Sequence, residues 1–139
     1  MVKSIEDNES IINFMDRAIH LASLAEGCTS PNPLVGAVVT DKNRKLIGEG
    51  FHPKTGMPHA EVFALNQAGE KAKGGSLFVN LEPCCHYGRT PPCVEKIISS
   101  GIKNVYVAMK DPDPRVSGKG IKKLRDAGLN VFEGILDKK

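Results

Sequence analysis

Leu34-Val35-Gly36-Ala37-Val38-Val39 is a run of small and aliphatic residues without a polar side chain. Such a run, bounded by Pro33 and a polar turn, is typical of a β-strand that is buried on both faces. The turn at residues 41–44 separates it from a second strand, which we predict over residues 45–51. Because the connection is short, we expect the two strands to form a hairpin.

The rest of the chain alternates between helical and strand patterns. Residues 10–26 predict a helix that starts at Asn8 or Ser10 and ends at Gly27. Its apolar residues recur at helical spacing: Ile11, Ile12, Met15, Ala18, Ile19, Ala22 and Ala25. Further helices are predicted near residues 59–69, 91–101 and 117–127. They are followed by strands at 75–80, 105–109 and 129–133, respectively. Strands separated by helices favour parallel pairing. The pattern therefore predicts an α/β fold, a three-layer α-β-α sandwich with a five-stranded mixed sheet.

Composition excludes several classes of protein. The 139 residues are expected to form a single domain, 1–139. A net charge of +3, two Tyr and no Trp argue against a nucleic-acid partner. No apolar run approaches the roughly 20 residues that span a bilayer, and the first residues are not a secretory signal, so we expect no membrane partner and a cytoplasmic location. The four cysteines are too few for a disulfide scaffold and indicate reduced thiols.

Three short segments predict a metal site: His59-Ala60-Glu61, Pro83-Cys84 and Cys93. One imidazole and two thiolates can hold Zn²⁺ and leave its fourth position open, as in catalytic zinc sites. Residues two apart in a helix point about 200° away from each other, so His59 and Glu61 can face one ion only from the start of a helix. Pro91-Pro92 places Cys93 at the start of another helix. The positive ends of both helices would stabilise the thiolates.

This set of residues predicts hydrolytic deamination. Zinc lowers the pKa of a bound water, and Glu61 would move protons from that water to a ring nitrogen and to the departing ammonia. Zinc deaminases of nucleobases carry the pattern H-x-E…P-C-x-x-C, whereas eight residues, 85–92, separate the two cysteines here. The alternative is a non-catalytic zinc-stabilised module, in which Cys85 or His86 supplies a fourth ligand.

Longer segments around these residues resemble one family, the pyrimidine deaminases of riboflavin biosynthesis, within the cytidine-deaminase-like superfamily. The resemblance extends from about residue 16 to residue 136, and the long spacing between the cysteines distinguishes this family from deaminases of cytidine or of transfer-RNA adenosine. The segments that carry it are Asn32-Pro33-Leu34-Val35-Gly36-Ala37-Val38, His59-Ala60-Glu61-Val62, Leu81-Glu82-Pro83-Cys84-Cys85-His86-Tyr87-Gly88-Arg89-Thr90-Pro91-Pro92-Cys93 and Ala108-Met109-Lys110-Asp111-Pro112-Asp113-Pro114.

The resemblance implies a cytidine-deaminase-like fold and an enzyme, a zinc-dependent aminohydrolase. Its implied substrate is the small phosphorylated pyrimidine 2,5-diamino-6-(ribosylamino)-4(3H)-pyrimidinone 5′-phosphate, which loses its C2 amine as ammonia. The implied zinc ligands are His59, Cys84 and Cys93, and the implied proton shuttle is Glu61. A homodimer or homotetramer is also implied. Bacterial relatives often continue into a reductase domain, which we do not expect within these residues. A deaminase of guanine or deoxycytidylate is the alternative.

By the same resemblance, six residues contact the substrate: Asn32, His52, His86, Arg89, Asp111 and Asp113. The guanidinium of Arg89 is suited to a phosphate because it can bind two oxygens at once. Each residue also has a simpler interpretation, since Asn and Asp next to proline form turns and loop charges face solvent. Many family members have Ser in place of Cys85 and Asn in place of Asp113.

Overall fold

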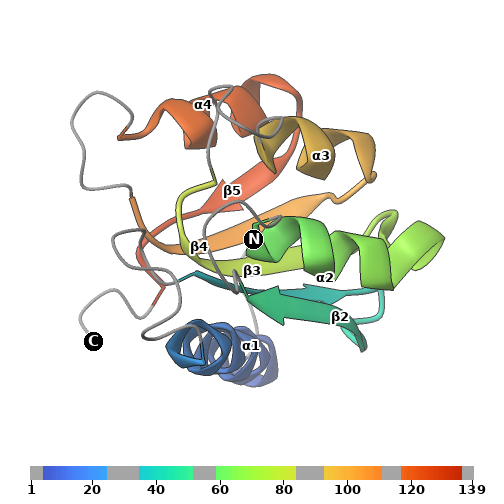
Figure 1. Ribbon diagram of the computed structural model, residues 1–139, viewed down its shortest axis with the longest axis vertical. Coiled ribbons are helices and arrows are strands. Elements are labelled where there is room, and N and C mark those ends of the chain that lie inside the picture. The colour runs from blue at the N-terminus through green and yellow to red at the C-terminus, as the bar shows by residue number, and fades with distance from the viewer. Residues whose placement is uncertain (1–4, 25–34, 52–58, 84–92, 111–116, 136–139) are drawn as a thin grey trace.

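The computed structural model describes residues 5–24, 35–51, 59–83, 93–110 and 117–135 (Figure 1). Apart from the short 3₁₀ helix η1, the order of elements is the one predicted from the sequence. The elements are α1 (Ile5–Ser23), β1 (Gly36–Thr40), β2 (Leu46–Phe51), α2 (Ala60–Ala68), η1 (Gly69–Ala72), β3 (Ser76–Leu81), α3 (Cys93–Ser99), β4 (Asn104–Met109), α4 (Lys119–Asp126) and β5 (Asn130–Phe132).

The strands form one sheet in the order β2-β1-β3-β4-β5. Strand β1 lies in the middle of an antiparallel trio, between β2 and β3. Strands β3, β4 and β5 are parallel to one another. The predicted hairpin and the predicted mixed sheet are therefore confirmed. The carboxyl ends of β3 and β4 lie at the same edge, where open α/β sheets place their ligands.

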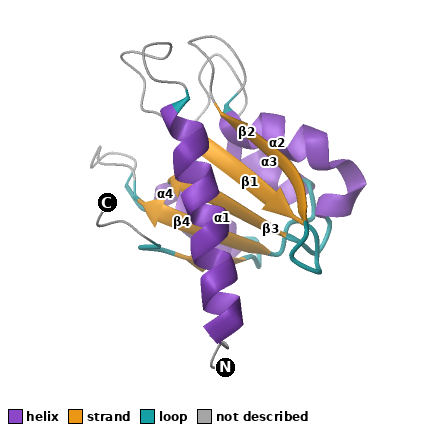
Figure 2. Cartoon of the chain, turned by 90° about the horizontal axis from the view of Figure 1, so that it is seen from below, coloured by secondary structure: helices purple, strands orange, loops and turns teal. Residues whose placement is uncertain are grey.

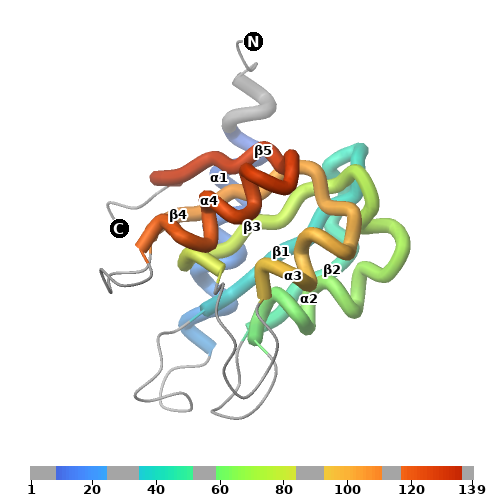
Figure 3. Tube along the Cα trace, turned by 90° about the horizontal axis from the view of Figure 1, so that it is seen from above, coloured from blue at the N-terminus to red at the C-terminus, as the bar shows by residue number. Residues whose placement is uncertain are grey.

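Helices cover both faces of the sheet. Helix α1 covers one face, and it runs across the strands in Figure 2. Helices α2, α3 and α4 cover the other face, side by side as Figure 3 shows. The three-layer α-β-α sandwich predicted from the sequence is thus confirmed.

Alternating residues of the central strands fill two separate cores. In β1, Ala37 and Val39 face α2–α4, whereas Val38 faces α1. All residues of β1 are buried, as predicted for a strand covered on both faces. The core under α1 is aromatic: the rings of Phe78 and Tyr106 stack with centroids 4.7 Å apart. Complete burial of a side chain such as Phe78 contributes about 1.5–3 kcal/mol to stability.

Two details of α1 differ from the sequence prediction. The helix runs over Ile5–Ser23 and not over 10–26, so Asn8 and Ser10 lie inside it and not at its start. It closes with a tight turn, in which the Leu24 amide donates to the Leu21 carbonyl at 3.1 Å. The predicted cap Gly27 lies outside the described residues. Capping residues are weak boundary signals where the flanking sequence is itself compatible with a helix.

The apolar stripe of α1 also differs from the prediction. Ile12 is 42% exposed, whereas Leu21, which the predicted stripe omits, is 5% exposed. A helix that packs across a twisted sheet buries a band set by its crossing direction, and this direction is decided by the sheet.

Helix η1 was not predicted. Gly69, with φ of 60°, ends α2, and the chain then returns to the core at the fully buried Ala72. None of the helices among the described residues has the length and apolar character needed to span a bilayer.

Candidate metal centre

The starts of two helices supply the side chains of the centre. His59 is the N-cap of α2 and has extended backbone angles, φ −72° and ψ 164°. Its carbonyl accepts hydrogen bonds from the amides of Val62 (3.0 Å) and Phe63 (3.3 Å). Glu61 is the second helical residue. Because His59 lies outside helical geometry, its side chain and that of Glu61 need not point to opposite sides. This is the placement at a helix start that the sequence predicts.

Cys93 is the first residue of α3, also as expected. Cys93 is 1% exposed. Two later residues of α3, Val94 and Ile97, are fully buried in the same hydrophobic core as the buried side of α2. Packing in this core therefore brings the starts of α2 and α3 together, although they are far apart in sequence.

The three side chains form a compact group, which we call the His-Glu-Cys cluster (His59, Glu61 and Cys93). One potential ligand atom from each residue lies within 4.8 Å of the other two. Within the cluster, His59 Nδ1 and Cys93 Sγ lie 3.1 Å apart. Glu61 is 3% exposed, Cys93 is 1% exposed and His59 is partly exposed, so His59 is the most exposed member of the cluster.

The donor set fits zinc. Imidazole nitrogen, thiolate sulfur and carboxylate oxygen are the three ligand types that zinc takes from proteins. At ordinary bond lengths and a tetrahedral angle, a zinc-bound nitrogen and sulfur lie about 3.5 Å apart. The observed separation of 3.1 Å needs an outward movement of a few tenths of an ångström to match this value. Small side-chain rotations are sufficient for such a movement.

Close backbone contact fixes α2 on the sheet. Ala60, Ala64 and Ala68 are buried on one side of the helix. This side faces β2, where a Cβ atom on Gly48 would lie 2.2 Å from the Ala64 carbonyl oxygen. The absence of side chains at this contact lets the helix approach the sheet closely and sets the depth of His59 and Glu61.

The structure does not test the other predicted site residues. They lie outside the described residues: Cys84 among the predicted metal ligands, and Asn32, His52, His86, Arg89, Asp111 and Asp113 among the predicted substrate contacts. Pro83, the residue before Cys84, is described and buried.

Two residues beside these segments have contacts that the sequence did not predict. The Asn80 side chain accepts a hydrogen bond from the Gly36 amide at 2.9 Å and so joins the end of β3 to the start of β1. Glu82 is 6% exposed, and its carboxylate accepts hydrogen bonds from backbone amides near the start of α4. In the sequence, Glu82 is a charged residue after a mainly apolar strand, within the segment 81–93 that carries the family resemblance.

Comparison with known proteins agrees with the fold and with a zinc site. Residues 8–109 match the family described as the cytidine and deoxycytidylate deaminase zinc-binding region. The chain is 58% identical to riboflavin biosynthesis protein RibD of Aquifex aeolicus over 90% of its own length and 35% of that protein. It is 54% identical to the diaminohydroxyphosphoribosylamino-pyrimidine deaminase of Buchnera aphidicola over 90% of its length and 84% of that protein.

A solved structure of Acinetobacter baumannii RibD superposes with a TM-score of 0.91 and 52% identity, over 94% of this chain and 36% of the other. The chain therefore spans about a third of these two RibD proteins but most of the Buchnera deaminase. The cytidine-deaminase-like fold expected from the resemblance is confirmed. The chain belongs to the zinc-binding family of cytidine and deoxycytidylate deaminases, in the branch that contains the pyrimidine deaminases of riboflavin biosynthesis.

Proposed function

We propose that this chain catalyses the zinc-dependent hydrolytic deamination of 2,5-diamino-6-(ribosylamino)-4(3H)-pyrimidinone 5′-phosphate, an early step of riboflavin biosynthesis. The observation that carries the proposal is the His-Glu-Cys cluster at the starts of α2 and α3. The name of the Buchnera relative, of which the chain covers 84%, supports the choice of substrate.

In this proposal, His59, Cys84 and Cys93 hold the zinc ion. One neutral imidazole and two thiolates would bring the charge of the centre to zero. When bound, zinc supplies a Lewis acid that lowers the pKa of a water molecule toward neutrality.

Glu61 moves the protons. Its carboxylate takes a proton from the attacking water as the new bond to C2 of the pyrimidine forms, and it gives a proton to the adjacent ring nitrogen. It then takes the proton of the new C2 hydroxyl and transfers it to the C2 amine, the C2–N bond breaks, and ammonia leaves as the C2 hydroxyl becomes a carbonyl group. At 3% exposure, Glu61 is shielded from bulk water, which keeps these protons within the site.

The segments that follow β3 and β4 would hold the substrate. These segments contain His86 and Arg89 after β3, and Asp111 and Asp113 after β4. The carboxyl ends of neighbouring parallel strands converge at one edge of a sheet, which suits a shared pocket. In the proposal Arg89 binds the phosphate, and Asn32 and His52 complete the contacts. Assembly into a homodimer or homotetramer stays a prediction.

Ammonia release tests the proposed function. The purified chain, loaded with zinc, should release ammonia from the phosphorylated riboflavin intermediate and much less from guanine, deoxycytidylate or the dephosphorylated intermediate. A chelator should abolish the release, and added zinc should restore it. Release from guanine or deoxycytidylate at a higher rate would identify another substrate, and no release from any of them would contradict a deaminase.

A further inference from the structure

Glu82 is a buried charged residue that the proposed reaction does not use. It follows β3 directly and is 6% exposed. Its Oε1 accepts a hydrogen bond from the Gly118 amide at 2.8 Å. Its Oε2 accepts from the amides of Gly120 (2.8 Å) and Ile121 (3.2 Å). The carboxylate therefore satisfies amides at the start of α4 and faces the positive end of the helix dipole.

The residue that caps α4 is far from the helix in sequence, which is unusual. A helix is normally capped by the side chain of its own N-cap residue, and Ser, Thr, Asp or Asn at that position is sufficient. Here the N-cap is Gly118, which has no side chain, and the cap comes from a residue 36 positions earlier. The interaction therefore joins the start of α4 to the end of β3, which a local cap would not do.

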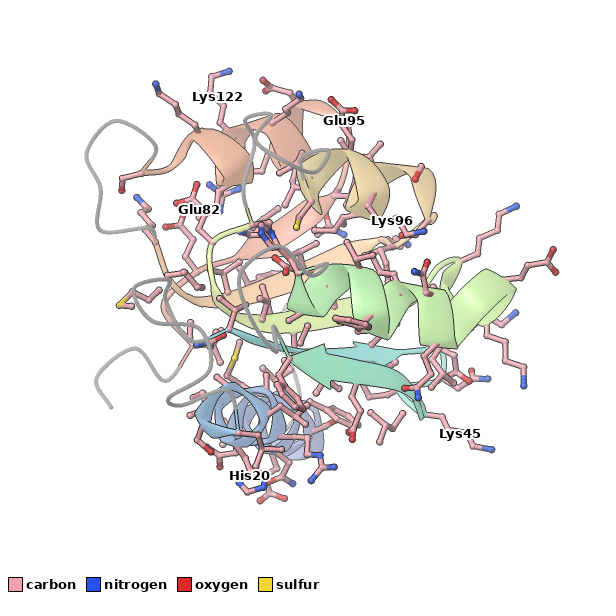
Figure 4. All side chains as sticks on the ribbon, viewed as in Figure 1. His20, Lys45, Glu82, Glu95, Lys96 and Lys122 are labelled. Carbon is pink, nitrogen blue, oxygen red and sulfur yellow. The ribbon has the colours of Figure 1, made fainter. Side chains whose placement is uncertain are left out.

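The same contact fixes Pro83. The backbone amide of Glu82 donates to the Met109 carbonyl at 2.9 Å, which ties Glu82 to β4. A Cβ atom on Gly120 would lie 2.2 Å from the Pro83 carbonyl oxygen, so the backbones of α4 and Pro83 are in direct contact. Figure 4 shows Glu82 in this place, between α4 and the strands. Glu82 and Gly120 together form what we call the β3–α4 clamp.

We propose that Glu82 is a positioning residue for the metal centre, because the β3–α4 clamp fixes the point at which the chain leaves β3 for Cys84. Cys84 is the residue after Pro83. Its thiolate has to meet the same ion as His59 and Cys93, which are already held by α2 and α3. This inference rests on the proposed function, since it assumes that the cluster binds zinc with Cys84.

The test compares metal binding by three variants with the wild-type chain. Glu82→Gln removes one acceptor oxygen and turns an NH₂ group toward backbone amides. Gly120→Ala keeps the carboxylate but pushes a methyl group against Pro83. Met15→Ala is the matched control, because Met15 is fully buried under α1, on the opposite face of the sheet. Zinc affinity is measured by competition with a chromophoric chelator, and cobalt replaces zinc to report thiolate coordination by absorption.

Glu82→Gln and Gly120→Ala should each weaken zinc binding by about 10- to 100-fold, as other residues that orient metal ligands do. The thiolate-to-cobalt absorption should fall in both, whereas Met15→Ala should lower the melting temperature without changing either metal readout. If Glu82→Gln does not fold, Glu82→Asp takes its place, since it keeps the charge but retracts the carboxylate, and the same direction is expected.

Two outcomes overturn the inference in distinguishable ways. Wild-type zinc affinity and cobalt spectra in a folded Glu82 variant would show that the clamp only stabilises the fold, and the proposed function would stand. A wild-type chain that binds no zinc would overturn the proposed function and the inference with it.

Discussion

At the scale of single residues, the centre depends on one departure from helical geometry. His59 has a ψ of 164°, and the helix begins only at Ala60. With His59 in an interior helical conformation, its ring and the Glu61 carboxylate would point to different sides. Pro58 directly precedes His59 in the sequence, and because proline is disfavoured in the interior of a helix, a helix that begins after it is expected. The predicted placement of His59 and Glu61 at a helix start is confirmed, whereas their chemical roles stay proposals.

Replacement of Glu61 by Gln separates catalysis from metal binding. The carboxamide has nearly the same shape but cannot accept and return a proton, so we expect the turnover number to fall by at least about 10²–10⁴-fold. Zinc content and the melting temperature should stay close to those of the wild-type chain. Ammonia release and metal analysis on the same preparation make the comparison. A variant with full turnover would contradict the proton-shuttle role, and a variant without zinc would make Glu61 a ligand.

At the scale of elements, the contact between α2 and β2 carries the metal centre. Gly48 and Gly50 leave room for α2 on the strand, so its backbone lies against the sheet. Sequence periodicity predicted both elements, but a glycine within a strand gives no indication of which helix lies over it. Only the packed structure identifies Gly48 as a contact on which the position of His59 depends.

Gly48→Ala should lower stability and disturb the site together. The new Cβ would meet the Ala64 carbonyl oxygen at 2.2 Å, and because this atom is backbone, α2 has to move. We expect a loss of about 1–3 kcal/mol in the free energy of unfolding, with weaker zinc binding. Leu46→Ala, at a 44% exposed position of the same strand, is the control and should change stability by only about 0.5 kcal/mol. Equal effects of the two variants, measured by denaturant unfolding, would contradict the packing argument.

A second contact between elements, the ion pair that joins α1 to β2, predicts a pH dependence. Arg17 donates two hydrogen bonds to the Glu49 carboxylate, at 2.9 and 2.7 Å. The hydrogen bond from Arg17, helped by its charge, lowers the pKa of Glu49 although partial burial opposes this. A carboxyl group with a lowered pKa in the folded state stabilises the fold above its unfolded pKa of about 4.3 and loses this contribution as pH falls through the folded pKa.

The melting temperature of the wild-type chain should therefore exceed that of Glu49→Gln near pH 7, and the difference should shrink as the pH is lowered toward about 3. The difference should be small, because the Arg17 side chain is 46% exposed, and added salt should reduce it further. Thermal unfolding followed at several pH values measures it. A difference that grows on acidification would mean that Glu49 is stabilised as the neutral acid.

At the scale of the whole molecule, the sheet separates two cores with different tasks. The core under α1 contains the aromatic stack of Phe78, Tyr106 and Phe132 and contributes stability. The core under α2–α4 brings together the starts of α2 and α3 and thus places the His-Glu-Cys cluster. A zinc ion at this cluster would link two helices on one face only, so its removal should affect the two faces unequally.

Removal of zinc should lower the melting temperature, since a ligand at about 1,000 times its dissociation constant stabilises a fold by about 4 kcal/mol. Amide hydrogen exchange should accelerate at the starts of α2 and α3, including Val62 and Phe63, but not in α1 around Met15. The melting temperature and the exchange rates are measured before and after treatment of the chain with a chelator. Cys93→Ala is the control and should respond much less. An unchanged melting temperature would contradict zinc binding at the cluster.

The sequence by itself determined the order of the elements, the complete burial of β1 and the position of His59, Glu61 and Cys93 at helix starts. These features follow from short-range causes: apolar periodicity, proline and glycine positions, and the geometry of a single helical turn. It was less reliable for α1, whose limits and buried side follow from its packing on the sheet.

Only the tertiary structure decided the strand order, the 3.1 Å approach of His59 to Cys93, and the cap that Glu82 provides to α4. The residues in these two contacts are 34 and 36 positions apart in the chain. No local pattern encodes such contacts, because they form only when cores on both faces of the sheet pack and bring separate helix starts to one place.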